Sequence, residues 1–249
     1  MSTSGEVATA AFTWRSASIT SQGNVRTHNE DAVLELPAAG LWAVADGMGG
    51  HNAGDVASRM IVEALHGVTR HSRPSELLDD VEDRLFAVNE KLYRGSLAGA
   101  GGMCGSTVAV LLAFGAHCLS VWAGDSRIYR SRAADLACIT RDHSEVQAMM
   151  DEGVLDAADA SRHNAQNVIT RAVGGGQDLY LDVELRELKH RDKYLLCSDG
   201  LYKELADDRL AAHLAANDPE GACRALLKEA LSGVCNDNAS AVVVQFSQT

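Results

Sequence analysis

Very short turns join consecutive strand-like segments near the middle of this chain, and they restrict its possible folds more than any other feature. Gly115-Ala116 separates residues 107–114 from 117–123, and Gly124-Asp125-Ser126 separates the second segment from residues 127–132. Turns of this length join antiparallel strands. The other segments rich in Val, Leu, Ile and aromatic residues, and therefore predicted to be strands, are residues 41–46, 181–188, 194–197 and 241–246.

Helical patterns occur between these strands in groups rather than after each strand. We expect helices over residues 53–68 and 75–92, where apolar residues recur at helical spacing, and over 219–230, where Asp218-Pro219 supplies an N-cap followed by proline. Runs of strands separated by helix pairs indicate an α+β layered fold rather than a doubly wound parallel sheet. Since the chain has no low-complexity linker or internal repeat, we expect one domain over residues 1–249.

The composition limits the partners and the compartment. The 249 residues are 46% hydrophobic and 22% charged, which is enough for a large core and excludes intrinsic disorder. With a formal net charge of −12 and no dense basic run, the protein is expected to bind neither nucleic acid nor an anionic membrane. No signal peptide or spanning segment is visible and the six cysteines lack zinc-like spacing, so we expect reduced thiols in a cytoplasmic protein, which we take to be a monomer.

Acidic residues stand at the ends of several predicted strands, next to glycine or asparagine. Any single Asp-Gly or Asn-Asp-Asn step is most simply interpreted as a turn. Carboxylates gathered in one place, however, repel one another and stay protonated unless cations hold them, and such hard oxygen ligands suit Mg²⁺ or Mn²⁺ rather than zinc. The acidic positions concerned are Glu30-Asp31, Asp46, Asp125, Asp199 and Asp237.

These positions lie in motifs that follow one another in a recognisable order. The motifs are RTHNEDA, VADGMGGHNAG, GGMCGSTVAVLL, WAGDSRIYR, ITRDHS, NVITRAVGG, YLLCSDGL and CNDNASAVVV. In this order the chain resembles the metal-dependent protein phosphatase family, also called protein phosphatase 2C, in its compact bacterial form, over about residues 16–246. The resemblance implies a four-layer α/β/β/α sandwich, in which helix pairs flank two antiparallel sheets, with a flexible flap over about residues 144–170.

The resemblance also implies a reaction. It predicts a serine/threonine phosphatase that holds two Mn²⁺ or Mg²⁺ ions, with a third bound weakly, and that hydrolyses phosphoserine and phosphothreonine by direct attack of a metal-bridging hydroxide. A pair of divalent ions lowers the pKa of a bound water and neutralises the phosphoryl oxygens. The expected partners are phosphorylated proteins, namely a bacterial Ser/Thr kinase and its substrates.

The acidic residues take metal-ligand roles by the same resemblance. Asp46 is expected to bridge both metals, and the backbone carbonyl of Gly47 to be a further ligand. Asp199 and Asp237 are expected to hold the first metal, and Asp125 to recruit the third together with Asp199.

Three neighbouring residues of the first motif receive roles at the second metal and at the substrate. Glu30 is expected to bind the second metal, and Asp31 to orient the metal-bound water. Arg26 matches the arginine that clamps the substrate phosphate, and a guanidinium fork suits two phosphate oxygens.

The chain departs from the family pattern at two places. Eukaryotic relatives have a histidine where this chain has Met48, so the general acid is open between His51 and metal-bound water, and His51 is equally compatible with a structural role at a loop-to-helix junction. In the flap, Gln166 stands at an arginine-like position, so substrate specificity does not carry over.

The sequence excludes two other kinds of site and leaves two other functions open. The glycine-rich residues 99–107 do not form a phosphate-binding loop, because Ala100 and Ser106 occupy the positions of the first glycine and the lysine. Ser126 lacks the histidine signature of a nucleophilic triad. A non-catalytic phosphoprotein-binding member of the same fold and a hydrolase of small phosphoesters remain as alternatives.

Overall fold

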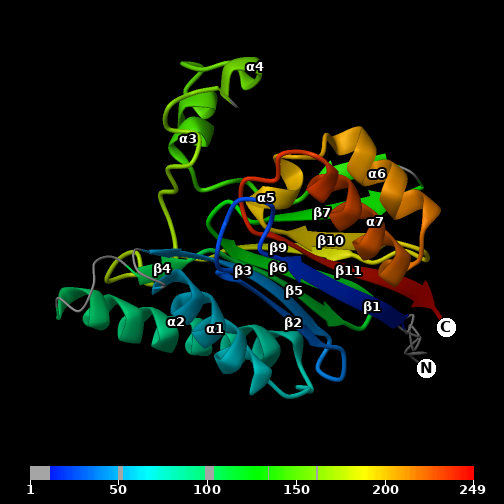
Figure 1. The fold of residues 1–249 in the computed structure, drawn as a ribbon. Coiled ribbons are helices and arrows are strands. Elements are labelled where there is room, and N and C mark those ends of the chain that lie inside the picture. The colour runs from blue at the N-terminus through cyan, green and yellow to red at the C-terminus, as the bar shows by residue number, and fades with distance from the viewer. Residues whose placement is uncertain (1–11, 50–52, 99–103, 134, 161) are drawn as a thin grey trace.

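The computed structural model describes residues 12–49, 53–98, 104–133, 135–160 and 162–249, and its strands form two antiparallel sheets (Figure 1). The first sheet has the strand order β1-β11-β10-β7-β8. Its strands are β1 (Phe12–Ser21), β11 (Ala239–Gln248), β10 (Lys193–Cys197), β7 (Arg127–Arg132) and β8 (Asp135–Cys138).

The second sheet has the order β2-β3-β5-β6-β9, with the short β4 paired to the end of β3. Its strands are β2 (Asp31–Leu36), β3 (Leu41–Gly49), β4 (Cys104–Ser106), β5 (Val108–Phe114), β6 (His117–Ala123) and β9 (Asp182–Glu187). The predicted antiparallel pairing across Gly115-Ala116 is confirmed, since Phe114 of β5 pairs with His117 of β6. The Gly124-Asp125-Ser126 turn, by contrast, carries the chain from one sheet to the other.

A pair of helices covers the outer face of each sheet. Helices α1 (Ala53–His66) and α2 (Pro74–Leu97) pack on the second sheet, while α6 (Asp207–Ala216) and α7 (Pro219–Ser232) pack on the first, next to the short α5 (Asp199–Tyr202). Figure 1 shows the resulting layers in the order helices, sheet, sheet, helices. The predicted four-layer α/β/β/α sandwich is therefore confirmed.

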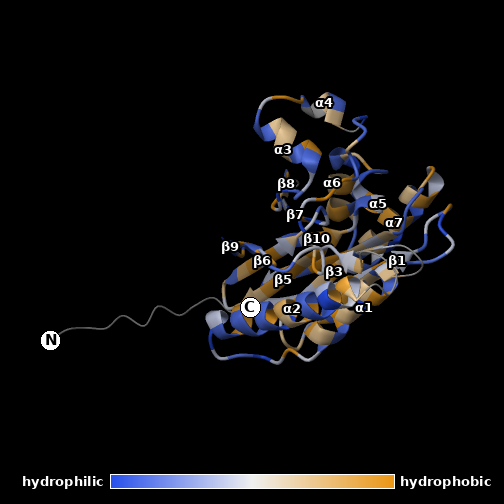
Figure 2. Ribbon diagram, turned by 90° about the vertical axis from the view of Figure 1, so that its left-hand side faces the viewer, coloured by the Kyte–Doolittle hydropathy of each residue, from blue (hydrophilic) through white to orange (hydrophobic). Residues whose placement is uncertain are grey.

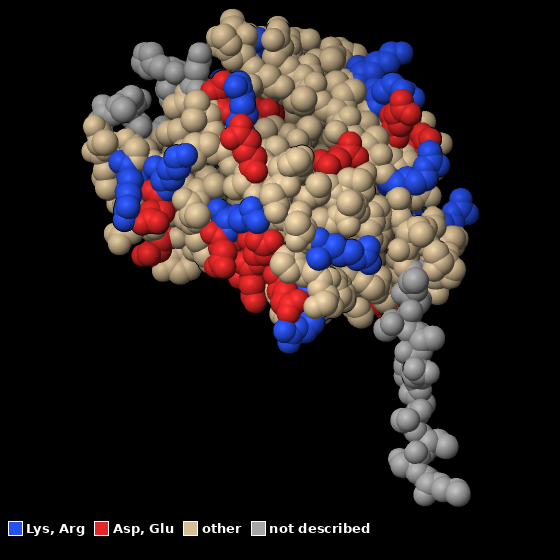
Figure 3. Space-filling model, turned by 90° about the horizontal axis from the view of Figure 1, so that it is seen from below, with Lys and Arg blue, Asp and Glu red and all other residues tan. Residues whose placement is uncertain are grey.

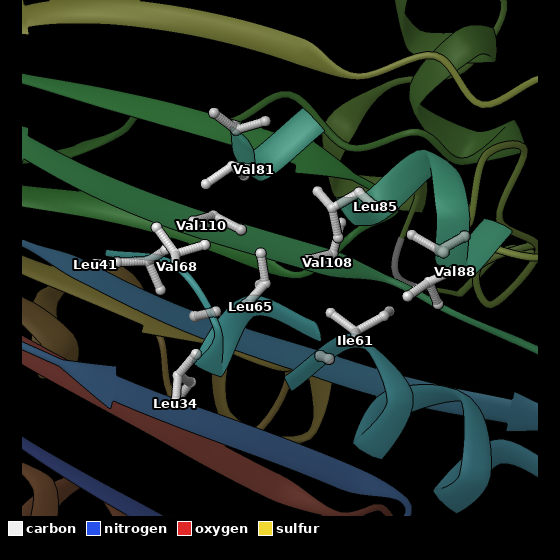
Figure 4. Close-up of a cluster of buried hydrophobic side chains, with 14 of the residues drawn as sticks. Leu34, Leu41, Ile61, Leu65, Val68, Val81, Leu85, Val88, Val108 and Val110 are labelled. Atoms are coloured by element: carbon white, nitrogen blue, oxygen red, sulfur yellow. The ribbon is translucent and has the colours of Figure 1, made fainter. Parts of the chain in front are cut away.

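Three apolar clusters hold the layers together. Under α1 and α2, Ile61, Leu65, Val81 and Leu85 are fully buried against strand residues such as Val110 (Figure 4). Their spacing in sequence is the helical spacing that predicted the two helices. A second cluster lies beneath α6 and α7.

The third cluster fills the space between the two sheets and is built around aromatic rings. Trp42 of β3 meets Phe246 of β11 edge to face at 6.1 Å, and Tyr194 of β10 meets the same phenyl ring at 5.8 Å. Edge-to-face pairs of this kind add to the free energy gained from burial alone. The contact between Trp42 and Phe246 joins β3 of the second sheet to β11 of the first, and so fixes how the sheets stack.

The predicted flap, over about residues 144–170, contains two short helices, α3 (Glu145–Asp151) and α4 (Ala157–Ala160). Both helices stand away from the body of the molecule (Figures 1 and 2). The base of the flap is held by backbone hydrogen bonds, in which Glu145 N donates to Val168 O and Thr170 N donates to His143 O. His143 is itself buried and accepts from Gly124 N through Nδ1, so the flap is anchored to the turn that carries Asp125.

Two further findings concern the cysteines and the length and polarity of the helices. All six cysteines are free thiols, as predicted. Across the described residues, the helices are all too short or too polar to cross a membrane. The assignment of residues 1–249 to one domain remains a prediction.

Candidate functional site

Asp31 and Asp46 are brought together by strand pairing. Asp31 is the first residue of β2, and it pairs directly with Asp46 near the end of β3. Directly paired residues of antiparallel strands project from the same face of a sheet. Two carboxylates that are 15 positions apart in the sequence are thus neighbours at one end of the second sheet.

Asp199 and Asp237 reach the same end from the first sheet. Asp199 opens α5 just after β10, and Asp237 lies just before β11, which pairs with β10. The two loops touch at Gly200, where a Cβ atom would lie 2.1 Å from the carbonyl oxygen of Asn238. Glycine at this position lets the two acidic loops approach each other.

Asn238 ties a third segment to these loops. Its side-chain amide donates to the carbonyl oxygens of Gln22 and His28, at 3.0 and 2.9 Å, and its Oδ1 accepts from Glu30 N at 2.8 Å. The loop that carries Arg26 and Glu30 is therefore held against the start of β11. Sequence reasoning missed this role, although the Asn-Asp-Asn motif contained the residue.

A cavity of about 250 Å³ opens where these segments meet. It brings together almost all of the predicted site residues. Those that line it are Arg26, Glu30, Asp46, Gly47, Asp125, Asp199 and Asp237.

Asp31 lies behind the cavity wall. Its Oδ2 accepts hydrogen bonds from the hydroxyls of Ser198 and Ser240, at 2.7 and 2.6 Å. Its Oδ1 is buried and has no hydrogen-bond partner. The contacts of Ser198 and Ser240 with Asp31 were not predicted from the sequence, because a hydroxyl beside an acidic motif is common and does not by itself indicate such a contact.

Gly47 lies where there is no room for a side chain. A Cβ atom there would lie 2.1 Å from the carbonyl oxygen of Gly54 and 2.6 Å from that of Glu30. The amide of Gly47 donates to the same Glu30 carbonyl at 3.1 Å. The end of β3, the start of α1 and the Glu30 loop thus meet at backbone distance beside the cavity.

Burial and mutual repulsion raise the pKa values of the central carboxylates. The pKa of Asp31 is raised to about 7, chiefly by burial and also by the charges of Asp199 and Asp237. Burial and the charge of Asp199 raise the pKa of Asp125 to about 7 as well. The pKa of Asp46 is raised well above its usual value by burial and by Asp31. Without a cation, the site resists carrying its full negative charge.

Two basic side chains partly offset this charge. Arg26 donates to Asp237 Oδ2 at 2.8 Å. Lys203, another residue missed from the sequence, donates from Nζ to Asp199 Oδ2 at 2.6 Å and to Asn167 Oδ1 at 2.8 Å. Across the described residues, no three His, Cys, Asp or Glu side chains already surround one point at ligand distance. Repulsion between carboxylates, together with these competing cations, accounts for the open arrangement.

The donor set nevertheless fits a hard divalent cation. Carboxylate and carbonyl oxygens line the cavity, and they are the ligands that Mg²⁺ and Mn²⁺ prefer. Asp199 Oδ1, like Asp31 Oδ1, is buried without a hydrogen-bond partner. A buried carboxylate oxygen without a donor is costly, and a bound cation would relieve that cost.

The pKa values predict how the stability of the metal-free protein depends on pH. The carboxyls of Asp31 and Asp125 have pKa values near 7 when folded and near 3.8 when exposed. Between these values the folded state binds more protons, so the free energy of unfolding falls as pH rises from about 4 to 7. In EDTA, we expect Asp31→Asn to gain stability relative to the wild type between pH 5 and pH 8, by roughly 1 kcal/mol or more.

Thermal unfolding of both proteins in EDTA at the two pH values measures this difference. The comparison with Asp31→Asn cancels the titration of groups elsewhere in the chain. A wild type that loses no stability relative to Asp31→Asn at higher pH would contradict the prediction.

The positions at which the chain departs from the family pattern lie in different places. Met48 lines the cavity, as its neighbours in the motif do. His51 lies outside the described residues. In the flap, Asn167 lines the cavity, whereas Gln166 lines a neighbouring cleft.

A sandwich of two antiparallel sheets with flanking helix pairs and a carboxylate-lined cavity at one end defines a metal-dependent phosphatase fold. The chain belongs to the protein phosphatase 2C family, whose sequence profile matches residues 20–232. It is 34% identical over 234 residues to the serine/threonine protein phosphatase PstP of Mycobacterium tuberculosis. That alignment covers 92% of this chain and 44% of PstP, so the chain spans less than half the length of this relative.

Solved structures agree with this assignment. PppA of Pseudomonas aeruginosa, described as a key regulatory component of T6SS, matches with a TM-score of 0.87 at 40% identity, covering 94% of this chain and 98% of PppA. The catalytic domain of PstP in complex with two manganese ions matches with a TM-score of 0.86 at 31% identity, covering 96% of this chain and all of that domain.

Proposed function

We propose that this protein is a metal-dependent serine/threonine phosphatase that hydrolyses phosphoserine and phosphothreonine monoesters in proteins. One observation carries the proposal: five acidic side chains and an arginine from both sheets line a single cavity. An acidic cavity would repel a phosphate unless divalent cations filled it. The family membership and the names of the relatives support the same activity.

The metal-holding residues would be Asp46, the Gly47 carbonyl, Asp199 and Asp237, with Glu30 and Asp125 at the margins of the cavity. Divalent ions bound there, Mn²⁺ or Mg²⁺, would supply an activated water and neutralise phosphoryl charge. Asp31 would hold and orient that water, because its hydroxyl partners keep one oxygen fixed while the other has no partner.

Arg26 would bind and orient the substrate phosphate. Its guanidinium lies at the exposed rim of the cavity, and among the described residues its ion pair is with Asp237. If Asp237 held a metal ion, the guanidinium would be available to fork onto two phosphate oxygens. The choice of general acid remains between His51 and metal-bound water, because Met48 has no proton to donate.

A phosphothreonine peptide tests the proposal. We expect hydrolysis in Mn²⁺, complete loss of activity in EDTA, and recovery when Mn²⁺ is restored. The value of kcat/KM for the peptide should also exceed that for p-nitrophenyl phosphate, which separates a protein phosphatase from a hydrolase of small phosphoesters. Full activity in EDTA would refute the metal-dependent reaction, and binding of the peptide without turnover would favour the phosphoprotein-binding alternative.

For its setting, we propose that the protein acts as a cytoplasmic monomer opposing a bacterial Ser/Thr kinase. The free cysteines support a reducing compartment, and the bacterial serine/threonine phosphatases among the relatives support the setting. Phosphoproteomes of cells with and without the protein test it. Phosphoserine and phosphothreonine sites should rise when the protein is absent, and an unchanged phosphoproteome would count against the proposal.

A further inference from the structure

A second cleft lies beside the metal cavity, between the flap and the body of the molecule. It has a volume of about 450 Å³, and Asp125 lines both spaces. The flap contributes Val146 and Met150 to its wall, and α5 contributes Tyr202. We call this space the flap cleft. A phosphorylated residue in the metal cavity would therefore place the adjoining residues of its chain at this cleft.

The wall of the flap cleft combines apolar side chains with two cations, Arg127 and Lys203, that are paired within the protein. Arg127 is bonded to both carboxylate oxygens of Asp142, at 2.9 and 2.7 Å, and its guanidinium stacks 3.8 Å from the ring centre of Tyr202. Lys203 is paired with Asp199. Lys203 also donates to Asn167 Oδ1, so both cations of the wall have partners within the protein.

The flap itself carries an excess of acidic residues. Between residues 145 and 162 there are five acidic residues and one arginine, Arg162. Asp151 is paired with Arg141 at the base of the flap. The remaining acids are exposed and form no ion pair with the described residues; they are Glu145, Glu152, Asp156 and Asp159.

We propose that the flap cleft binds the residues flanking the phosphorylated side chain, and that it selects substrates with lysine or arginine there. The aliphatic stem of such a residue would pack on Val146, Met150 and Tyr202. Its charge would be attracted by the unpaired carboxylates of the flap, of which Glu145 and Asp159 adjoin lining residues of the cleft in sequence. Complementary charge of this kind determines which partners bind and how fast they associate. The inference rests on the proposed phosphatase function and adds a substrate class to it.

Matched phosphothreonine peptides with Lys, Ala or Glu at the flanking positions test the selection. At low salt, kcat/KM for the Lys peptide should exceed that for the Glu peptide by about tenfold, and the ratio should shrink at about 0.5 M salt, since salt screens exposed charges. Equal rates for the two peptides would overturn the proposal.

Two sets of neutralising substitutions locate the effect. In the flap, Glu145→Gln, Glu152→Gln, Asp156→Asn and Asp159→Asn together should bring the Lys-to-Glu ratio close to one. The control is the same change of charge on α1 and α2, with Glu63→Gln, Asp79→Asn, Glu82→Gln and Asp83→Asn. These two helices cover the face in Figure 3, which carries its own acidic side chains. If the control lowers the ratio as much as the flap set does, overall charge and not the flap selects the substrate.

The apolar wall has its own test. Met150→Ala should raise KM for the Lys peptide about three- to tenfold through loss of buried contact, whereas Val154→Ala, an exposed flap residue outside the cleft, should not. Equal KM values in the two variants would overturn this part of the proposal. Hydrolysis of p-nitrophenyl phosphate, which has no flanking residues, reports separately on the proposed function. If no substrate is turned over, fluorescence anisotropy of labelled Lys and Glu peptides decides the inference by their affinities.

Discussion

Asp46→Asn is expected to lower kcat/KM for a phosphothreonine peptide in Mn²⁺ on the order of 10³-fold, because it removes a charged oxygen from the centre of the cavity. Calorimetric titration should show the matching loss of Mn²⁺ affinity. In EDTA the same variant should be more stable than the wild type, since burial raises the pKa of Asp46 and its ionised form is costly. This gain in stability would distinguish loss of a ligand from misfolding.

Asp135→Asn is the matched control for this substitution. Asp135 is an exposed residue of β8 and does not line the cavity. It should leave both Mn²⁺ affinity and activity unchanged. If Asp46→Asn binds Mn²⁺ as tightly as the wild type, Asp46 is not a metal ligand.

Gly47→Ala is expected to be strongly disruptive for a single added methyl group. Its Cβ would lie within 2.6 Å of two backbone carbonyl oxygens, those of Gly54 and Glu30, and backbone cannot move aside as a flexible side chain can. We expect a loss of about 3 kcal/mol in the free energy of unfolding, with weaker Mn²⁺ binding because α1 and the Glu30 loop separate from β3. Chemical denaturation and metal titration measure the two effects.

Gly95→Ala provides the comparison. Gly95 lies in α2, and a Cβ atom there would meet nothing within 4 Å. Because alanine is the better helix former, this change should stabilise the protein by up to about 1 kcal/mol. Similar stabilities for the two variants would show that the tight approach at Gly47 does not exist in solution.

Much of the fold was predictable from local patterns. The apolar spacing of α1 and α2, the N-cap at Asp218 and the short turn at Gly115 each specify a local conformation, and the structure contains all three. The helices differ from the prediction mainly at their ends; α2, for example, continues to Leu97 rather than stopping at residue 92. Helix ends depend on packing and capping contacts that periodicity does not describe.

Other elements left no clear local signal. β1 alternates Ser, Thr and Arg with apolar residues and is only half-buried, so it is defined by its pairing with β11 and not by an apolar run. α6 is rich in Ala and Asp, and only Leu210 and Leu214 of its residues are buried. In both cases a distant partner, and not the segment itself, determines the conformation.

For the site, the resemblance of the acidic motifs to those of the family predicted which carboxylates meet at one cavity, and their roles as metal ligands stay a prediction. The surroundings of those carboxylates depend on the tertiary structure. Ser198 and Ser240 contact Asp31 only because β10 pairs with β11, and Lys203 reaches Asn167 only because the end of the flap returns beside α5.

The sequence by itself therefore determined the antiparallel strands and the helix pairs, which follow from turn length and periodicity, and its family motifs predicted which acidic residues line one cavity. Only the tertiary structure decided which hydroxyls and cations face these ligands, how closely Gly47 packs, and where the flap cleft opens. Such contacts join residues as far apart as Asp31 and Ser240, and their geometry arises from the pairing and stacking of whole sheets. Local sequence patterns do not specify that geometry.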